Sequence, residues 1–259
     1  MTRVKNTAGI LGIAGMCILL IAIIVSIIGY EDGPYSLSNC FVSELGLYTS
    51  GYMTISYALI FNIGMIVSGL LFAAFMVTQG IKENTQIHTV IGFFGTLTGV
   101  LIAAQGVFTL NYVQYHYIVT TAFFVSSFVM CALYVVSQIM NTNRGKLSFT
   151  NMIVAFFAGV ISAVYTGFML TDGMAQVLAQ DAAKISRPSF MPFSVVEWIA
   201  YLLVMAFFTI LAVEMLLFSH RLINADVHNK LPKLKNSPIA VKVRPSYIKD
   251  KSDTRNIEL

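Results

Sequence analysis

Two carboxylates and one histidine are the side chains in this sequence that could do chemistry together. Glu44 lies in the polar stretch SNCFVSELG (38–46), His116 follows the short segment NYVQY, and Glu197 lies near the start of the last apolar run. A histidine flanked by two carboxylates could hold a proton or bind a polar headgroup, because imidazole changes its charge near neutral pH. These ligand types could also suit a metal ion. No CxxC or HExxH spacing accompanies them, and we predict no metal and no cofactor.

Further polar residues are expected at the same level of the molecule as these three. Asn62 and Gln105 lie toward the matching ends of the second and third apolar runs. The candidate site for a headgroup or ligand consists of Ser43, Glu44, Asn62, His116, Glu197 and Trp198. The same groups could instead only satisfy one another's hydrogen bonds and tie helix ends together. Trp198 could equally be an aromatic anchor at the membrane interface, and no residue is assigned a catalytic role.

The composition shows what kind of element must position these side chains. The chain has 259 residues, of which 57% are hydrophobic and 11% charged, whereas soluble domains are about a quarter charged. Its mean hydropathy is +0.76. These values predict an integral, multi-pass membrane protein.

Six apolar runs are long enough to cross a hydrocarbon core, which takes about 20 residues of helix. Continuous runs of this length predict helices rather than the alternating strands of a barrel. The predicted fold is therefore all-α, a six-helix transmembrane bundle over residues 1–220. Its helices are expected at about 8–30, 54–79, 89–110, 117–140, 152–170 and 195–218.

The distribution of basic residues predicts the orientation of the bundle, because Lys and Arg are enriched in cytoplasmic loops. Lys184 and Arg187 would lie outside, and all other basic residues inside. Both termini are therefore predicted to be cytoplasmic. The two long connections, 31–53 and 171–194, then lie on the extracytoplasmic face together with the candidate site.

The third apolar run carries small residues on one face. At about 100° per residue, its glycines and one alanine project in nearly the same direction. In lipid, small residues let two helix backbones approach closely, so we predict helix packing there; a groove for a lipid or ligand is the alternative. The five residues are Gly92, Gly95, Gly99, Ala103 and Gly106.

The fourth run carries a polar stripe that could line a path through the membrane. Thr120, Ser127 and Gln138 project near His116, but Phe123 and Tyr134 lie on the same stripe. Two large rings would interrupt a water-filled route. The stripe therefore favours hydrogen bonding between helices over conduction.

Residues 221–259 form a basic segment with prolines at 232, 238 and 245, for which we predict a disordered cytoplasmic tail. Basic residues beside a membrane attract anionic lipids, so contact with such lipids is one expected role. The same charge could serve only to fix the topology. Nucleic acid is not an expected partner, because no aromatic platform or folded basic domain accompanies the charge.

Several short stretches, in order, resemble the Frag/DRAM/Sfk membrane proteins and related uncharacterised prokaryotic membrane proteins. YSLSNCFVSELG (35–46) resembles their first outer loop, and FNIGMIVSGLLFAAFMV resembles their second helix with its outer Asn62. GVFTLNYVQYHYIVTTAFF resembles the turn before a helix that begins with a histidine, and VEWIAYLLVMAFF resembles the Glu-Trp start of the sixth helix. Val42 and Tyr117 depart from the family pattern.

The resemblance implies a lipid-related role, because the eukaryotic members act in GPI-anchor remodelling, in control of plasma-membrane lipids and in lysosomal autophagy. Our leading expectation is a lipid-regulatory or lipid-handling accessory factor. A transporter of a small polar or lipidic substrate and a membrane-embedded lipid-modifying enzyme are the alternatives. The membrane would be the plasma membrane or, in a eukaryote, the Golgi or the lysosome. The ligand, any turnover and the oligomeric state stay open.

Overall fold

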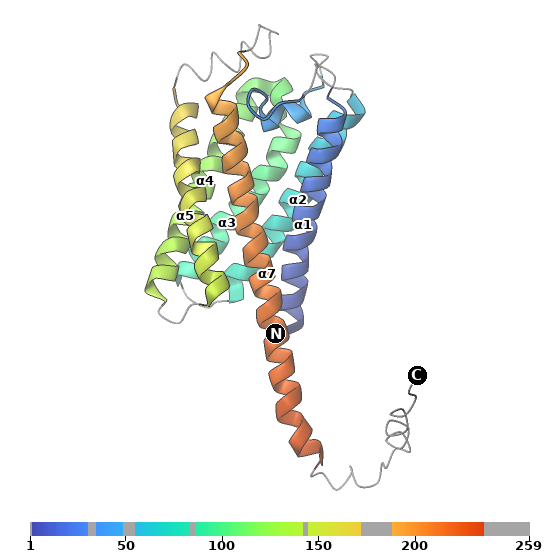
Figure 1. Ribbon diagram of the computed structural model, residues 1–259, viewed down its shortest axis with the longest axis vertical. Helices are drawn as coiled ribbons and strands as arrows, with labels where there is room; N and C mark the ends of the chain where they lie inside the picture. The colour runs from blue at the N-terminus through green and yellow to red at the C-terminus, as the bar shows by residue number, and fades with distance from the viewer. Residues whose placement is uncertain are drawn as a thin grey trace, which may run out of the picture.

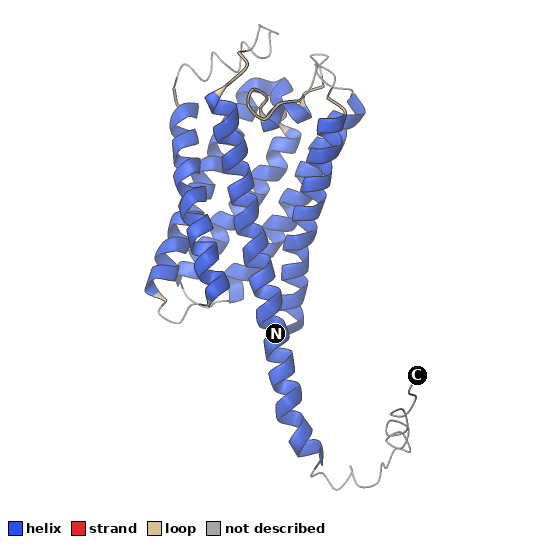
Figure 2. Cartoon of the chain, viewed as in Figure 1, coloured by secondary structure: helices blue, strands red, loops and turns tan. Residues whose placement is uncertain are grey.

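Helices form nearly all of the regular structure in the computed structural model of the chain (Figure 2). The structure describes residues 2–30, 35–48, 55–82, 86–141, 145–171 and 188–235. The α-helices are α1 (Thr2–Ile28), α2 (Ile55–Lys82), α3 (Gln86–Val107), α4 (Val113–Met140), α5 (Lys146–Met169) and α7 (Pro192–Lys235). Two short 3₁₀ helices, η1 (Val42–Gly46) and η2 (Leu110–Tyr112), lie in the connections.

The described residues include six helices that are long and apolar enough to cross a membrane. The all-α, six-span prediction is therefore confirmed. The candidate spans are Thr7–Ile28, Ile55–Ile81, Gln86–Val107, Leu110–Met140, Lys146–Met169 and Pro192–Leu217.

The helices are arranged as a ring in chain order. Each of α1 to α5 packs against the next, and α7 closes the ring by packing against both α5 and α1. Both 3₁₀ helices lie at one end of the bundle, which we call the η1 end, and α1 begins at the opposite end (Figure 1). The last helix thereby comes to lie beside the first.

Two boundaries differ from those that the sequence predicts. The third helix ends at Val107 and η2 takes up the next residues, while α4 begins at Val113, so His116 lies inside the first turn of α4. In addition, α7 continues to Lys235, far beyond the expected end at 218. This extension includes residues 221–235, for which we predicted disorder. Residues 236–259 of the predicted tail lie outside the described residues.

The small residues of α3 are buried against α2, where the two backbones almost touch. A Cβ atom added at Gly99 would meet the backbone N of Ala73 and the backbone O of Gly69. A Cβ at Gly92 would likewise meet the Gly80 backbone. Close approach of this kind is how helices associate where lipid replaces water.

We expect Gly99→Ala to destabilise the protein and Gly167→Ala, the same change in α5, to be tolerated. The added methyl group at position 99 meets backbone atoms that cannot rotate away, and such overpacking costs about 1–3 kcal/mol. Among the described residues, no atom lies within 4 Å of a Cβ added at Gly167, where alanine should add about 0.5–1 kcal/mol of helix stability. Thermal unfolding of both variants in detergent micelles measures the difference. Equal melting temperatures would contradict the close α2–α3 contact.

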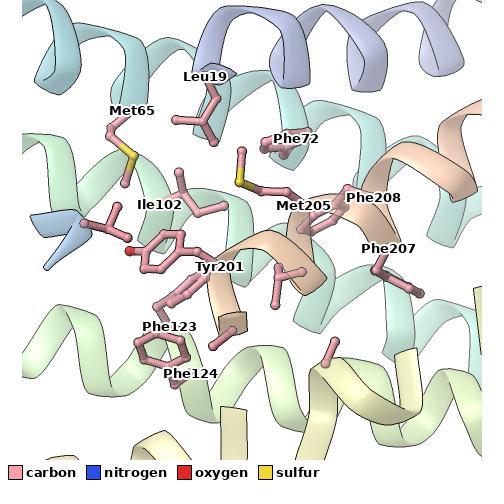
Figure 3. Close-up of a cluster of buried hydrophobic side chains, with 14 of the residues drawn as sticks. Leu19, Met65, Phe72, Ile102, Phe123, Phe124, Tyr201, Met205, Phe207 and Phe208 are labelled. Carbon is pink, nitrogen blue, oxygen red and sulfur yellow. The ribbon is translucent and has the colours of Figure 1, made fainter. Parts of the chain in front are cut away.

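The interior of the ring is filled by large hydrophobic side chains, among them several aromatic rings (Figure 3). Phe72 of α2 stacks on Phe208 of α7, with ring centroids 4.9 Å apart, and Phe123 of α4 stacks on Tyr201 of α7 at the same separation. Phe207 contacts Tyr134 edge to face. The middle of the bundle is thus tightly packed, and α7 supplies a ring to each of these contacts.

Candidate functional site

The segment that follows α1 folds over the η1 end of the bundle. Glu44, which belongs to this segment, stabilises it through hydrogen bonds to its own backbone and side chains. The Glu44 side chain is fully buried, and its Oε1 atom accepts a hydrogen bond from the Phe41 backbone N–H at 2.9 Å. Its Oε2 atom accepts a hydrogen bond from the Tyr30 hydroxyl at 3.3 Å. A glutamate that binds the amide three residues before it is half of a capping box. Glu44 therefore stabilises η1 locally.

Glu197 binds the next amide of the same turn from the far end of the chain. It lies in the second turn of α7, is 1% exposed, and its Oε2 atom accepts the Val42 N–H at 2.8 Å. Hydrogen bonds from an amide to a carboxylate are about twice as strong as neutral ones. Two carboxylates, Glu44 and Glu197, thus satisfy two successive amides, those of Phe41 and Val42.

Two other α7 side chains hold the carbonyl group that precedes this turn. The Ser194 hydroxyl donates to the Cys40 carbonyl oxygen at 2.5 Å, and the Trp198 Nε1–H donates to the same oxygen at 3.0 Å. Trp198 is 5% exposed, so it is a buried anchor of the loop and not an aromatic side chain that faces lipid. Ser194, Glu197 and Trp198 share one face of α7 because they follow the i, i+3, i+4 spacing.

Asn62 of α2 fastens the other end of η1. Its Nδ2 donates to the Gly46 carbonyl oxygen at 3.1 Å, and both residues are buried. A Cβ added at Gly46 would meet Asn62 Oδ1, so this close approach requires glycine. The η1 segment is therefore held by α2 on one side and by α7 on the other.

His116 is buried, and its hydrogen-bond partners are not the two carboxylates of the candidate site. Its Nδ1 lies 2.7 Å from the Phe108 carbonyl oxygen and must donate to it, since a carbonyl can only accept. Its Nε2 lies 3.2 Å from Thr120 Oγ1. Both ring nitrogens are therefore engaged: Nδ1 holds the segment before α4, and Nε2 bonds to the next turn of α4 itself. Among the described residues, His116 forms no hydrogen bond with Glu44 or Glu197.

A small cavity of about 10 Å³ lies directly beneath η1. Gln105 of α3 lines it and is 5% exposed, and its Nε2 atom has no hydrogen-bond partner among the described residues. Ser43 reaches the cavity from above, while Glu44, Glu197 and Trp198 do not line it. The complete lining is Val42, Ser43, Phe61, Asn62, Met65, Gln105, Thr109, His116 and Tyr201.

The two carboxylates also affect a tyrosine in the covering segment. The Tyr35 hydroxyl donates to the Phe41 carbonyl oxygen at 2.8 Å. Burial, reinforced by the negative charges of Glu44 and Glu197, raises the pKa of the Tyr35 phenol well above its usual value. The phenol therefore stays protonated and remains a donor to the loop at any physiological pH.

Sequence reasoning missed three of the contributors to this site: Tyr30, Ser194 and Thr109. Ser194 had a signal, because it shares one helix face with Glu197 and Trp198. Tyr30 and Thr109 had none, since the former follows an apolar run and the latter belongs to a short turn. Among the described residues, no group of three His, Cys, Asp or Glu side chains is arranged to hold a metal ion.

Comparison with known proteins identifies a family over most of the chain. Residues 13–214, which include all six candidate spans in whole or in part, match the family described as "Protein of unknown function (DUF998)". No curated protein and no solved structure matches the chain. These comparisons do not support the resemblance to Frag/DRAM/Sfk proteins. The chain belongs to the DUF998 family, and it is a multi-pass membrane protein of that family.

Proposed function

We propose that this protein binds the headgroup of a membrane lipid at the η1 end of the bundle, as a lipid-handling accessory factor. The observation that carries the proposal is the cavity beneath η1, into which Gln105 presents a buried amide without a partner among the described residues. A buried donor left unpaired costs about 1–3 kcal/mol. A ligand atom that accepts from Gln105 recovers this free energy.

The depth of the cavity supports a headgroup as the ligand. Gln105 lies two residues before the end of α3, and His116 lies in the first turn of α4. Helix ends of a transmembrane bundle lie near the headgroup region of the bilayer. The basic-residue distribution supports an extracytoplasmic location for this end and cytoplasmic termini. Contact of the basic tail with anionic lipids is a separate part of the proposal.

The contacts of the polar residues favour binding over catalysis. A general base must be within reach of the proton that it removes. The described carboxylates of this region are instead occupied by the Phe41 and Val42 amides, and His116 uses both ring nitrogens.

Packing in the middle of the bundle gives no support to the transporter alternative. Transporters bind their substrate near the bilayer midplane, between elements that move against each other. Aromatic rings from α2, α4 and α7 occupy that level here (Figure 3).

The test compares Asn62→Leu with Asn151→Leu. Both residues are buried asparagines, but Asn62 lines the cavity, whereas Asn151 bonds to Tyr134 on α4, away from it. Lipids that copurify with wild-type protein and with each variant are quantified by mass spectrometry. We expect one lipid class to be depleted from Asn62→Leu and retained by Asn151→Leu.

A second variant protects this test against loss of folding. If Asn62→Leu fails to give folded protein, Thr109→Val removes a cavity hydroxyl at nearly constant shape. The proposal is wrong if the variants that fold carry the same lipids, in the same amounts, as wild-type protein.

A further inference from the structure

The lining of the cavity beneath η1 combines polar and apolar side chains. Among the described residues, it contains no Asp, Glu, Lys or Arg. Glu44 and Glu197 do not line the cavity, and they accept hydrogen bonds from the Phe41 and Val42 amides. The lining therefore offers hydrogen bonds without a counter-charge for an ion.

The lining offers both hydrogen-bond donors and a hydrogen-bond acceptor. Gln105 Nε2 is a donor without a partner among the described residues. Thr109 Oγ1 accepts from Asn111 Nδ2 at 2.9 Å, so its own hydroxyl proton is available for donation. Asn62 donates through Nδ2 to Gly46, and its carbonyl oxygen is an acceptor at the same wall. A group that both accepts and donates fits this set.

A phosphate does not fit this set. Moving an anion out of water without a cation to pair with it carries a large desolvation cost. The two buried carboxylates that hold η1 add repulsion at short range. A hydroxyl group carries no charge, donates one hydrogen bond and accepts two. The volume agrees, because about 10 Å³ is the space of a single water-sized group.

We infer that the cavity binds one hydroxyl group of an uncharged lipid headgroup, such as the glycerol of a diacylglycerol or the sugar of a glycosyl-diacylglycerol. Gln105 donates to the hydroxyl oxygen, and the hydroxyl proton is donated to Asn62 Oδ1. The inference rests on the proposed function above and names the ligand class of the same site. It excludes lipids that present only a phosphate.

The experiment measures lipid binding by full-length protein in phosphatidylcholine nanodiscs, using native mass spectrometry. Diacylglycerol, monoglucosyl-diacylglycerol and phosphatidic acid with identical acyl chains are added in turn, and free glycerol is added as a competitor. Gln105→Met removes the amide at constant side-chain length. Gln114→Met is the matched control, because Gln114 is exposed and does not line the cavity.

We expect wild-type protein and Gln114→Met to retain the two uncharged lipids about tenfold better than phosphatidic acid, and Gln105→Met to lose about tenfold of that retention. The melting temperature of ligand-free Gln105→Met should equal or exceed that of wild type, because the substitution removes a buried donor that has no partner among the described residues. Free glycerol should not displace the lipids.

The other outcomes overturn different statements. If phosphatidic acid binds best and Gln105→Met weakens it, headgroup binding stands and the uncharged class is wrong. If free glycerol displaces the lipids, the ligand is a soluble polyol and not a lipid. If Gln105→Met binds all three lipids as wild type does, neither the inference nor the headgroup proposal at this cavity survives.

Discussion

Replacing Trp198 by alanine is expected to lower the free energy of unfolding by about 3–5 kcal/mol, the usual loss for a large buried aromatic side chain. Trp198 is 5% exposed and donates to the Cys40 carbonyl oxygen. Its ring also meets that of Tyr35 edge to face, with centroids 6.1 Å apart. The substitution removes the packing and the hydrogen bond together, so the segment before η1 should loosen.

Circular dichroism during chemical unfolding in detergent micelles measures this loss. Fluorescence cannot serve, since Trp198 is the only tryptophan of the chain. Trp198→Phe is the control: it keeps an aromatic ring, loses only the Nε1–H bond, and should cost about 1 kcal/mol. A local readout is the labelling rate of the Cys40 thiol, which is buried in the wild type. Slow labelling of Cys40 in Trp198→Ala would contradict the anchoring role.

Replacing Glu197 by leucine should cost about 3 kcal/mol and release η1 from α7. The substitution leaves the buried Val42 N–H without its acceptor at 2.8 Å. Glu197→Gln keeps an oxygen acceptor and loses only the charge, so we expect about 1 kcal/mol for it. The order of stability should therefore be wild type, then the glutamine variant, then the leucine variant, as measured by the same chemical unfolding.

Glu214→Leu provides the matched control on the same helix. Glu214 lies about five turns farther along α7, close to the far end of its candidate span at Leu217. Cys40 labelling should accelerate in Glu197→Leu and stay at the wild-type rate in Glu214→Leu. If Glu197→Leu leaves Cys40 as protected as in the wild type, the hydrogen bond to Val42 does not fasten the loop.

The membrane helices could be predicted from the sequence because their physical requirement is local. A hydrocarbon core demands about 20 consecutive apolar residues, and this demand is visible without knowledge of any partner. The predicted start of α4 was less accurate. The turn between α3 and α4 forms η2, and His116 is held by the Phe108 carbonyl group, so the helix begins before the apolar run does.

The sequence predicts which residues gather at the candidate site, but not which groups they bind by hydrogen bonds. Topology alone brings Glu44, Asn62 and Glu197 to one end of the bundle. Which groups they bind depends on backbone amides, and the sequence does not mark these: Glu197 binds the Val42 amide and not His116. Likewise, Gln105 is one polar residue among several in the sequence, and only the packed structure shows that its amide lacks a partner among the described residues.

The hydrogen bond between Val42 and Glu197 joins residues 155 positions apart, and this separation has a consequence for biosynthesis. Most of the membrane domain must be synthesised before the acceptor for that amide exists. During synthesis, a chain with its first five helices inserted lacks the α7 side chains that bind the backbone of residues 37–42, namely Ser194, Glu197 and Trp198. Neither closure of the helix ring by α7 nor fastening of η1 by Glu197 can therefore precede the synthesis of α7. A nascent chain that stops before α7 would leave the Val42 amide without this carboxylate acceptor.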